Sequence, residues 1–304
     1  DQTGMAQPTA TPFPNIEAAP TQDRDRPVIY VDGANGRDSY AGTATAPLKT
    51  MTQALKQAKP GTIIRVRAGV YTAQSGETFP LFVGSNITLQ ADPALPRSQS
   101  VQITGGGKYL SLTWAGQSTT IVAADDAHIE GLGLTNPNTR GTAIWVEKGA
   151  PTIVKNRFVG SDREGIFVAG EAAPTIQDNV FEQNGGNGLS FTRDAGGMVR
   201  GNLIRNNGFG VAIGDRAKPQ LLNNEISRNK DGLVINGAAQ PTLEANLIEA
   251  NGRDGVVVTQ TAQPVLERNA FSGNGQYDLH NTSLAPLQVK GTNIAGLKTT
   301  GQIQ

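Results

Sequence analysis

The chain has 304 residues, and its 26 acidic and 26 basic side chains give a formal net charge of zero. A neutral chain lacks the basic surface that nucleic-acid binding requires, and no apolar run approaches the roughly 20 residues of a membrane helix. Cys is absent, which excludes disulfides and thiolate metal sites and is compatible with an oxidising compartment.

Residues 1–27 differ in composition from the rest of the chain. They are rich in Pro, Thr, Ala and Gln and offer little to bury, which is typical of a flexible tether or linker. Alternatively, Phe13 and Ile16 anchor this segment on the outside of the folded domain. The chain begins at Asp1 and not at Met, as a mature product does after signal cleavage, although a trimmed chain would begin in the same way.

The folded domain is expected to begin with a cap over residues 28–61, in which an apolar strand and a glycine-rich loop precede a helix. Thr50, with Gln53 three residues later, forms a capping box, and apolar residues recur on one helical face until Pro60 stops the helix. Such a helix is suited to plug the open end of a solenoid, which otherwise exposes apolar side chains and unpaired strand edges.

From Pro151 to Asn274 the sequence repeats with a step of 22 or 23 residues. The consensus of the repeat contains Pro, two Asn, a Gly and apolar residues at fixed places. The first Asn recurs at Asn156, Asn179, Asn202, Asn224, Asn246 and Asn269. The second recurs at Asn184, Asn207, Asn229, Asn251 and Asn274. A fixed period in this range indicates a solenoid, in which no single repeat can bury its apolar face alone.

One apolar column extends this period over nearly the whole chain, at steps of 22 to 24 residues. Its members are Val66, Leu89, Leu112, Leu134, Phe158, Phe181, Ile204, Ile226, Ile248, Phe271 and Ile294. Within each repeat the apolar residues lie at a spacing of two, which is the periodicity of a β-strand. We therefore predict an all-β fold, a single-stranded right-handed parallel β-helix of about 10–11 coils, on the order of 50 Å long at roughly 4.8 Å per coil.

The repeat breaks down towards the C-terminus, where the stretch 276–279 departs from the pattern. We predict that the β-helix occupies residues 28–294 and that residues 295–304 form a polar C-terminal tail. The two Asn columns have a structural explanation, because a side-chain amide at a tight bend can pair with the backbone or with the same Asn one coil away. We therefore assign the Asn columns to the fold and give them no catalytic role.

Several motifs in the N-terminal part resemble those of a bacterial family. They are Tyr30-Val31-Asp32, Gly36-Arg37-Asp38-Ser39, Ala46-Pro47-Leu48-Lys49-Thr50, Pro60-Gly61-Thr62-Ile63-Ile64 and Ala68-Gly69-Val70-Tyr71. That family is catalogued as a domain of unknown function at the N-terminus of parallel β-helix proteins, and the later coils resemble the NosD-type repeats of the pectate-lyase-like superfamily. The two resemblances cover residues 28–281 and imply a secreted or cell-surface β-helix associated with polysaccharide. They imply no particular reaction, because related rods include lyases, hydrolases, epimerases and adhesins.

The densest charged feature lies in the loops that follow strands of successive repeats. Alignment on the glycine that opens each strand places Glu171, Asp194 and Arg216 in one column and Arg193 and Asp215 in the next. Uronate lyases need cations to neutralise a substrate carboxylate and a base to remove the neighbouring proton. The candidate catalytic residues are therefore Arg193, Asp194, Asp215 and Arg216. The alternative interpretation is a surface ion-pair ladder that holds the loops in register.

A second group resembles the acid pair of polygalacturonase-like hydrolases: Asp125 and Asp126, with His128 nearby. Neighbouring residues on a strand point to opposite faces, so the two aspartates can serve one site only within a turn. The other motifs of those hydrolases are absent, and His128 is better interpreted as a strand-edge residue.

No metal site is predicted. Asp162, Glu164 and Asp178 offer oxygen ligands of the kind that Ca²⁺ accepts, but no calcium-loop motif is present. The two histidines, His128 and His280, are far apart in the sequence, which argues against copper or zinc. We expect no cofactor, with Ca²⁺ as the one alternative left open.

Outward strand positions form a partly apolar column. Its members are Phe167, Ser190, Ala212, Val234 and Val257. An exposed apolar stripe indicates that something lies against it, such as the N-terminal segment, the C-terminal tail or a partner. A flat face of a β-helix can also bind an extended glycan, for which the available aromatic platforms are Trp114, Trp145 and Phe167.

The sequence therefore predicts one β-helix domain that works outside the cytoplasm, in the extracellular space, in the periplasm or on the cell surface. We expect a structural or polysaccharide-binding role, with extracellular polysaccharide as the partner and with neither nucleic acid nor a membrane span. The alternative is a polysaccharide lyase or epimerase that acts on uronate-containing glycans; glycoside hydrolysis is the less favoured chemistry.

Overall fold

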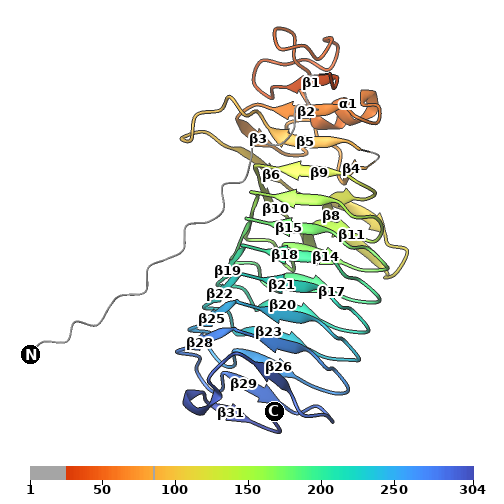
Figure 1. The fold of residues 1–304 in the computed structure, drawn as a ribbon. Coiled ribbons are helices and arrows are strands. Elements are labelled where there is room, and N and C mark those ends of the chain that lie inside the picture. Colours follow the sequence, from red (N-terminus) through yellow and green to blue (C-terminus); the bar gives the residue numbers. More distant parts are fainter. Residues whose placement is uncertain (1–24, 85) are drawn as a thin grey trace, which may run out of the picture.

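The computed structural model describes residues 25–84 and 86–304, so the predicted anchoring by Phe13 and Ile16 lies outside the described residues. The predicted right-handed parallel β-helix is confirmed. Three parallel sheets, which we name A, B and C, run along the rod, and successive coils contribute their strands in the order B, C, A (Figure 1). No helix in the described part of the chain is long and apolar enough to cross a membrane.

Within the described residues, sheets A and C have eleven strands each, and sheet B has nine. Sheet A consists of β1 (Val28–Val31), β2 (Ile63–Val66), β5 (Thr88–Ala91), β9 (His128–Glu130), β12 (Thr152–Val154), β15 (Thr175–Gln177), β18 (Met198–Arg200), β21 (Gln220–Leu222), β24 (Thr242–Glu244), β27 (Val265–Glu267) and β30 (Gln288–Lys290). Sheet B consists of β3 (Gly69–Tyr71), β6 (Val101–Thr104), β10 (Leu132–Thr135), β13 (Arg157–Val159), β16 (Val180–Glu182), β19 (Leu203–Arg205), β22 (Glu225–Ser227), β25 (Leu247–Glu249) and β28 (Ala270–Ser272). Sheet C consists of β4 (Leu81–Val83), β8 (Gly116–Ala123), β11 (Gly141–Val146), β14 (Ile166–Val168), β17 (Asn187–Phe191), β20 (Phe209–Ile213), β23 (Asp231–Ile235), β26 (Val256–Val258), β29 (Leu279–Asn281) and β31 (Thr299–Thr300), with β7 (Gly107–Leu110) paired to β8.

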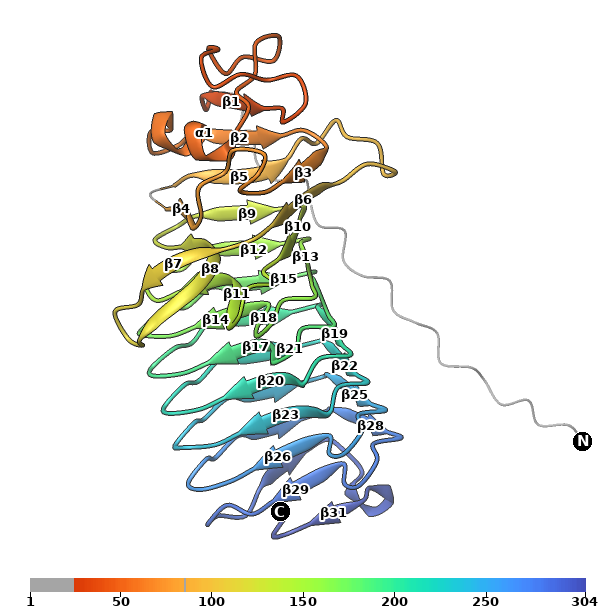
Figure 2. The same ribbon diagram turned by 180° about the vertical axis from the view of Figure 1, so that it is seen from behind.

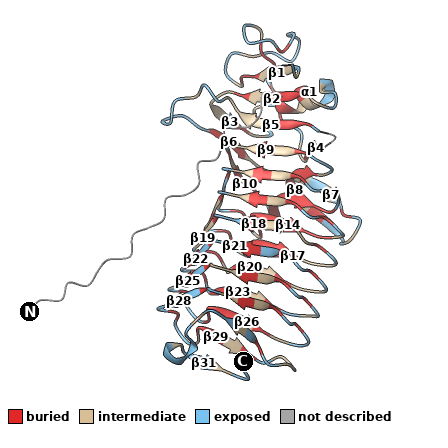
Figure 3. Ribbon diagram, viewed as in Figure 1, coloured by how far each residue is buried: buried red, intermediate tan, exposed pale blue. Residues whose placement is uncertain are grey.

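The core is a set of apolar columns inside the rod. Phe158, Phe181 and Ile204 are paired one above the other in sheet B and are fully buried. The rings of Phe158 and Phe181 stack with their centroids 4.7 Å apart. Because alternate strand residues face inward, the buried positions recur at the same place in successive coils and form columns along the rod (Figure 3).

The predicted apolar column is wrong on the N-terminal side of Leu134 and at its last member, Ile294. Sheet B continues there through Ile103 and Tyr71. The members that lie elsewhere are Val66 and Leu89 in sheet A, Leu112 in an exposed turn and Ile294 in a 3₁₀ helix (Ile294–Gly296). The true steps, from Tyr71 to Ile103 and on to Leu134, exceed thirty residues because both coils carry insertions. One insertion is the loop over residues 92–100, and the other contains β7.

The predicted capping helix is present as α1 (Met51–Gln57). The hydroxyl of Thr50 accepts a hydrogen bond from the Gln53 N–H at 3.0 Å, and the carboxylate of Glu77 accepts from the N–H groups of Met51 and Thr52. The helix contacts β1, β2 and β4, and it lies in the first coil at the place where later coils have a strand of sheet C. It therefore covers the apolar edge that the first coil would otherwise expose.

The Asn columns form hydrogen-bond ladders at two corners of the rod. In the first column, the Asn202 Oδ1 accepts from both the backbone N–H and the side-chain amide of Asn179, at 2.9 and 3.1 Å. The Asn179 amide also donates to the Ile153 carbonyl. The ladder begins at Asn156, whose side-chain oxygen accepts from the Leu132 N–H. Each buried amide thus joins two coils and leaves none of its polar atoms unpaired.

Residues 295–304, predicted from the sequence to form a polar tail, are part of the C-terminal end of the rod. Within 295–304, β31 pairs with β29, and Ile303 forms a bridge to Leu287. Leu287 is buried, and Ile303 and Leu297 pack against the core. These residues therefore complete the last coil among the described strands.

Candidate functional site

An antiparallel hairpin interrupts the regular winding between β6 and β11 and projects over the outer face of sheet C (Figure 2). Its arms are β7 and the first half of β8, paired from Gly107 with Thr119 to Leu110 with Gly116. The second half of β8 joins sheet C between β4 and β11. Glycine is required at position 107, because a Cβ there would lie 1.9 Å from the carbonyl oxygen of Phe79.

Three aromatic side chains meet at the tip of this hairpin. Trp145 and Phe167 occupy paired outward positions of β11 and β14 and stack with their ring centroids 4.2 Å apart. The ring of Trp114, in the hairpin turn, meets Phe167 edge-on at 5.9 Å. Trp145 and Phe167 are only 1 % and 5 % exposed, whereas Trp114 is 40 % exposed. The structure therefore brings together the three aromatic residues singled out from the sequence, and the element that covers Phe167 is the hairpin.

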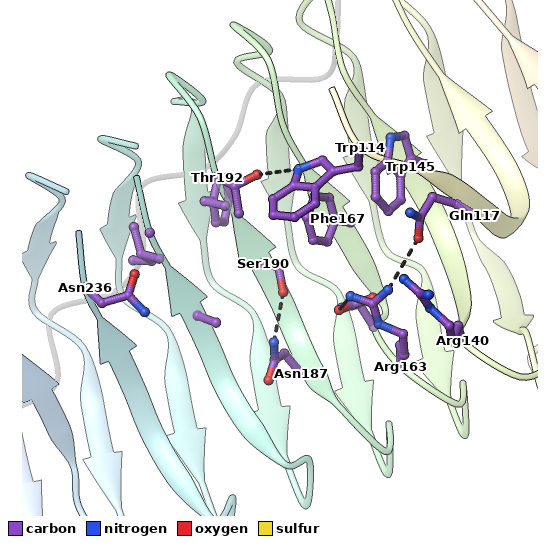
Figure 4. A pocket seen from close by; sticks show the side chains of 15 residues that line it. Trp114, Gln117, Arg140, Trp145, Arg163, Phe167, Asn187, Ser190, Thr192 and Asn236 are labelled. Atoms are coloured by element: carbon purple, nitrogen blue, oxygen red, sulfur yellow. Dashed lines mark hydrogen bonds and ion pairs between the residues drawn. The ribbon is translucent and has the colours of Figure 1, made fainter. Parts of the chain in front are cut away.

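A groove with a volume of about 240 Å³ runs from the hairpin along the outer face of sheet C (Figure 4). Trp114 and Gln117 of the hairpin border it towards the N-terminal coils, and Asn236 lies at the opposite end. Its floor includes the outward residues Ser190 and Ala212. The charged and amide side chains along its length are Gln117, Arg140, Arg163, Glu164, Asn187 and Asn236, and Ser190 and Thr192 add hydroxyl groups. The groove therefore combines an aromatic wall with a row of hydrogen-bonding groups.

Glu164 is the acidic group of the groove and is buried. One carboxylate oxygen accepts from the hydroxyl of Thr142 at 2.6 Å, and the other pairs with Arg163 at 3.1 Å. Burial raises the pKa of Glu164, although the positive charge of Arg163 opposes this shift. Arg163 also donates to the side-chain oxygen of Gln117 at 3.3 Å, so it connects the side of the groove to the hairpin.

Arg140 supplies a second cation. Its backbone N–H donates to the Asp162 carboxylate at 2.6 Å, which fixes the turn before β11. Within residues 25–84 and 86–304, its guanidinium makes no hydrogen bond and no ion pair. The groove therefore carries two cations, Arg140 and Arg163, against one carboxylate, Glu164.

Glu147, which follows β11, fastens the hairpin to the sheet. Its carboxylate accepts hydrogen bonds from the Tyr109 hydroxyl at 2.8 Å, from the Leu112 N–H at 3.1 Å and from the Ser111 hydroxyl. It also accepts from the hydroxyl of Thr113 at 3.0 Å. Burial alone would raise the pKa of Glu147, but the hydrogen bonds from Ser111 and Leu112 bring it below its ordinary value.

The four candidate catalytic residues lie together in the turns after β17 and β20. Arg216 forms a bidentate pair with Asp194 at 2.7 and 2.8 Å, and both side chains are exposed. Arg193 pairs with Asp215 at 3.3 Å. The hydrogen bond from Arg216 lowers the pKa of Asp194. The four residues pair with one another beside the groove, and none of them lines it.

Arg193 has a further set of contacts with the hairpin. Its guanidinium donates to the Thr113 carbonyl at 2.9 Å and lies over the ring of Trp114. The indole N–H of Trp114 donates to the Thr192 hydroxyl at 3.3 Å. Arg193 therefore holds Trp114 in place at the edge of the groove, by a hydrogen bond and a cation–π contact.

The second candidate group, Asp125, Asp126 and His128, lies in a turn and in the strand that follows it. Asp125 and Asp126 lie in a turn, where Asp126 accepts a hydrogen bond from the Asn86 N–H at 2.5 Å. His128 lies in β9, with its Nε2 2.9 Å from the Glu130 carboxylate.

The carboxylates considered as Ca²⁺ ligands, those of Asp162, Glu164 and Asp178, accept hydrogen bonds from different partners. The carboxylate of Asp178 accepts from the Gln177 amide at 2.9 Å, while Asp162 and Glu164 have the partners given above. In the described part of the chain, no group of three or more His, Asp or Glu side chains is arranged to hold a metal ion.

Sequence reasoning missed Gln117, Arg140, Arg163 and Asn187, as well as the clamp residue Glu147. They lie in the hairpin, at the start of β17 or in the corners next to the strands of sheet C, where the repeat pattern does not distinguish them from other polar residues. One signal was available. The triple glycine at 105–107, shortly before Trp114, marks the insertion, although the apolar column runs past it through Leu112 at an unbroken step.

Comparison with solved structures shows the fold. Similar chains include pectate lyase Pel9A, with 14 % identity and a TM-score of 0.58 over 91 % of this chain and 79 % of that chain. Another is pectin methylesterase PemA from Erwinia chrysanthemi, with 12 % identity and a TM-score of 0.52 over 87 % of this chain and 92 % of that chain. The complex of XylC with xylose has 11 % identity and a TM-score of 0.53 over 79 % and 69 % of the two chains. At such identities the likeness concerns the fold alone.

Sequence comparison gives the family. No curated protein matches the chain at a significant level. A family described as "Protein of unknown function (DUF1565)" matches residues 34–296, which include all strands from β2 to β30. The chain belongs to this family.

Proposed function

We propose that this protein binds polysaccharide in the groove on the outer face of sheet C and works outside the cytoplasm. The observation that carries the proposal is the half-exposed ring of Trp114 beside a row of amide and guanidinium groups. Sugar rings pack their apolar C–H faces on aromatic side chains, and their hydroxyls pair with such planar polar groups. Arg193 and Glu147 fix the hairpin before any ligand binds. Binding therefore does not carry the entropic cost of ordering the hairpin.

The charge of the groove favours an acidic glycan. Arg163 is partly neutralised by Glu164, whereas the guanidinium of Arg140 has no partner within the described residues. A planar guanidinium binds a carboxylate in a bidentate manner. The similar fold of a pectate lyase and of a pectin methylesterase supports the same class of ligand by analogy.

The test is an array of acidic and neutral polysaccharides probed with the intact protein, followed by calorimetry on each hit. The expected result is binding to at least one uronate-containing polymer, weakened by salt because part of the attraction is ionic. A protein that binds no polysaccharide on the array, although it is folded by circular dichroism, would contradict the proposal.

A second candidate function is a polysaccharide lyase or epimerase that uses Arg193, Asp194, Asp215 and Arg216. The observation in its favour is that two cations and two carboxylates lie on consecutive coils immediately beside the groove. A lyase would create double bonds in uronate polymers, which are followed by ultraviolet absorbance, and an epimerase would change the sugar composition seen by NMR. Polymers that stay unchanged in both assays would rule out this function for the substrates tested.

A further inference from the structure

The outward positions of sheet C form a continuous column parallel to the rod axis. From β14 to β26 the paired members are Phe167, Ser190, Ala212, Val234 and Val257. Neighbouring members are separated by one strand spacing, roughly 4.8 Å, which is comparable to the length of one sugar unit in an extended chain. If the proposed function holds, the bound glycan lies along the rod with about one unit per coil.

The hairpin crosses this column on the N-terminal side of the groove. Val122, Trp145 and Phe167 are paired outward residues of β8, β11 and β14, and all three are buried beneath it. Phe82, the next member towards the N-terminus, is 60 % exposed. Ser190, the next member after Phe167, is also buried, whereas Ala212, Val234 and Val257 are partly exposed. The column is therefore covered from Val122 to Ser190 and accessible on both sides of that stretch.

Contacts on several sides hold this block in place. Glu147 binds the backbone and hydroxyls of the hairpin turn, as described above. Arg193 and Thr192, which follow β17, bind the hairpin turn: Arg193 donates to the Thr113 carbonyl, and Thr192 accepts from the Trp114 indole. Arg163 binds Gln117 from the opposite side of the groove. A chain that continued along the column would have to break all of these contacts.

We propose that the groove is closed at the hairpin and takes the end of a polysaccharide chain, with the terminal sugar against Trp114. The following units extend over Ser190, Ala212 and Val234 towards the C-terminal coils, where the face of sheet C is open. This inference rests on the proposed function and adds that the protein recognises a chain end and not an internal segment.

The closed end also has the groups needed to recognise a terminal unit. Arg140 and Arg163 lie there, with the Gln117 amide held between Arg163 and the Ala115 carbonyl, whereas Asn236 lies at the open end (Figure 4). A terminal sugar has an additional free hydroxyl or hemiacetal oxygen that an internal unit lacks. Donors concentrated at the blocked end therefore discriminate in favour of a chain terminus.

The test counts protein molecules per glycan chain. Length-defined fragments of polygalacturonate, alginate and xylan are titrated by calorimetry, and the mass of each complex is measured by light scattering. Chain-end recognition predicts one protein per chain at every fragment length. A stoichiometry that rises in proportion to fragment length would overturn the inference and leave polysaccharide binding intact. Binding to none of the three polymers would remove the proposed function and this inference with it.

A hairpin variant tests whether the hairpin is the reason that only one protein binds each glycan chain. Replacement of residues 111–115 by a short Gly/Asn turn removes the tip of the hairpin together with Trp114, so each binding event should be weaker, but a long fragment should then bind more than one protein. One protein per long chain in this variant, with circular dichroism unchanged, would show that the hairpin does not close the groove. Where the variant does not fold, the stoichiometry of the unaltered protein decides the question.

Discussion

The guanidinium carbon of Arg193 lies 4.3 Å from the centroid of the Trp114 ring. The sequence predicts Arg193 to be a catalytic cation, and the structure places it over the ring of Trp114 and pairs it with Asp215. Its guanidinium therefore interacts both with the Asp215 carboxylate and with the face of the Trp114 ring. In the binding function that we propose, Arg193 is a positioning residue whose effect on a ligand is transmitted through Trp114.

Replacement of Trp114 by Ala should weaken polysaccharide binding about tenfold, because the loss of a stacked ring costs about 1.4 kcal/mol. The fold should be unaffected, since the ring is half-exposed and lies outside the core of the rod. Calorimetry with the best glycan of the array measures the effect. Phe82→Ala is the matched control, because Phe82 is an exposed aromatic residue of the same sheet on the other side of the hairpin. Equal affinities for the two variants would exclude Trp114 as the platform.

Replacement of Arg140 by Gln should weaken the binding of acidic glycans by about tenfold and leave neutral glycans unaffected, because only the ionic contact is lost. The salt dependence of binding should also become shallower. Arg97→Gln serves as the control, since Arg97 is an exposed cation in the insertion loop over residues 92–100. Parallel losses on acidic and neutral ligands would contradict a role in charge recognition.

Glu147 should make the hairpin sensitive to acid. Its pKa in the folded protein is below the ordinary value of 4.5, so its stabilising effect is complete above that pH and is lost as the pH falls through the lower, folded value. The two tryptophans of the chain, Trp114 and Trp145, both contact the hairpin region, so intrinsic fluorescence reports its opening.

In Glu147→Gln the hydrogen bonds to a charged acceptor are weakened, at a local cost of about 1.5–3 kcal/mol. The variant should show at neutral pH the fluorescence that the unaltered protein shows only in acid. Glu171→Gln, at an exposed position, is the control. Identical fluorescence of Glu147→Gln and the unaltered protein at every pH would show that Glu147 does not hold the hairpin.

Replacement of Asn202 by Ala should lower the free energy of unfolding by about 1–3 kcal/mol, the cost of leaving buried polar groups unpaired. The variant removes the acceptor for the Asn179 N–H and amide and the donor to the Ile176 carbonyl. Thermal and denaturant unfolding measure the loss. Gln220→Ala, at an exposed strand position, should stay close to the unaltered protein. A tolerated loss of Asn202 would contradict the structural role of the ladder.

Replacement of Arg216 by Ala should change neither the thermal midpoint nor the affinity for polysaccharide. The Arg216–Asp194 pair is exposed and screened by solvent, and it does not line the groove. Arg193→Ala, in contrast, should weaken binding because it releases Trp114. Loss of a measurable lyase or epimerase activity in Arg216→Ala would instead support the catalytic proposal.

The sequence by itself determined the winding of this protein. A period of 22 or 23 residues with apolar positions two apart requires that like residues pair with like residues one coil away, as Phe158 and Phe181 do. The same rule aligns the Asn columns at the corners, since each amide pairs with its equivalents and with the backbone of the neighbouring coils. Both results follow from local alternation and a fixed repeat, which are one-dimensional properties.

Only the tertiary structure decided where the groove lies. The insertion that contains β7 breaks the period, so the apolar column predicted through Leu112 was wrong there, and nothing in the repeat indicates which face an insertion will cover. The position of the hairpin results from contacts between residues far apart in sequence, such as Thr113 with Arg193 and Leu112 with Glu147. Charge pairs and aromatic contacts of this kind depend on distances in space, and a repeat pattern carries no information about them.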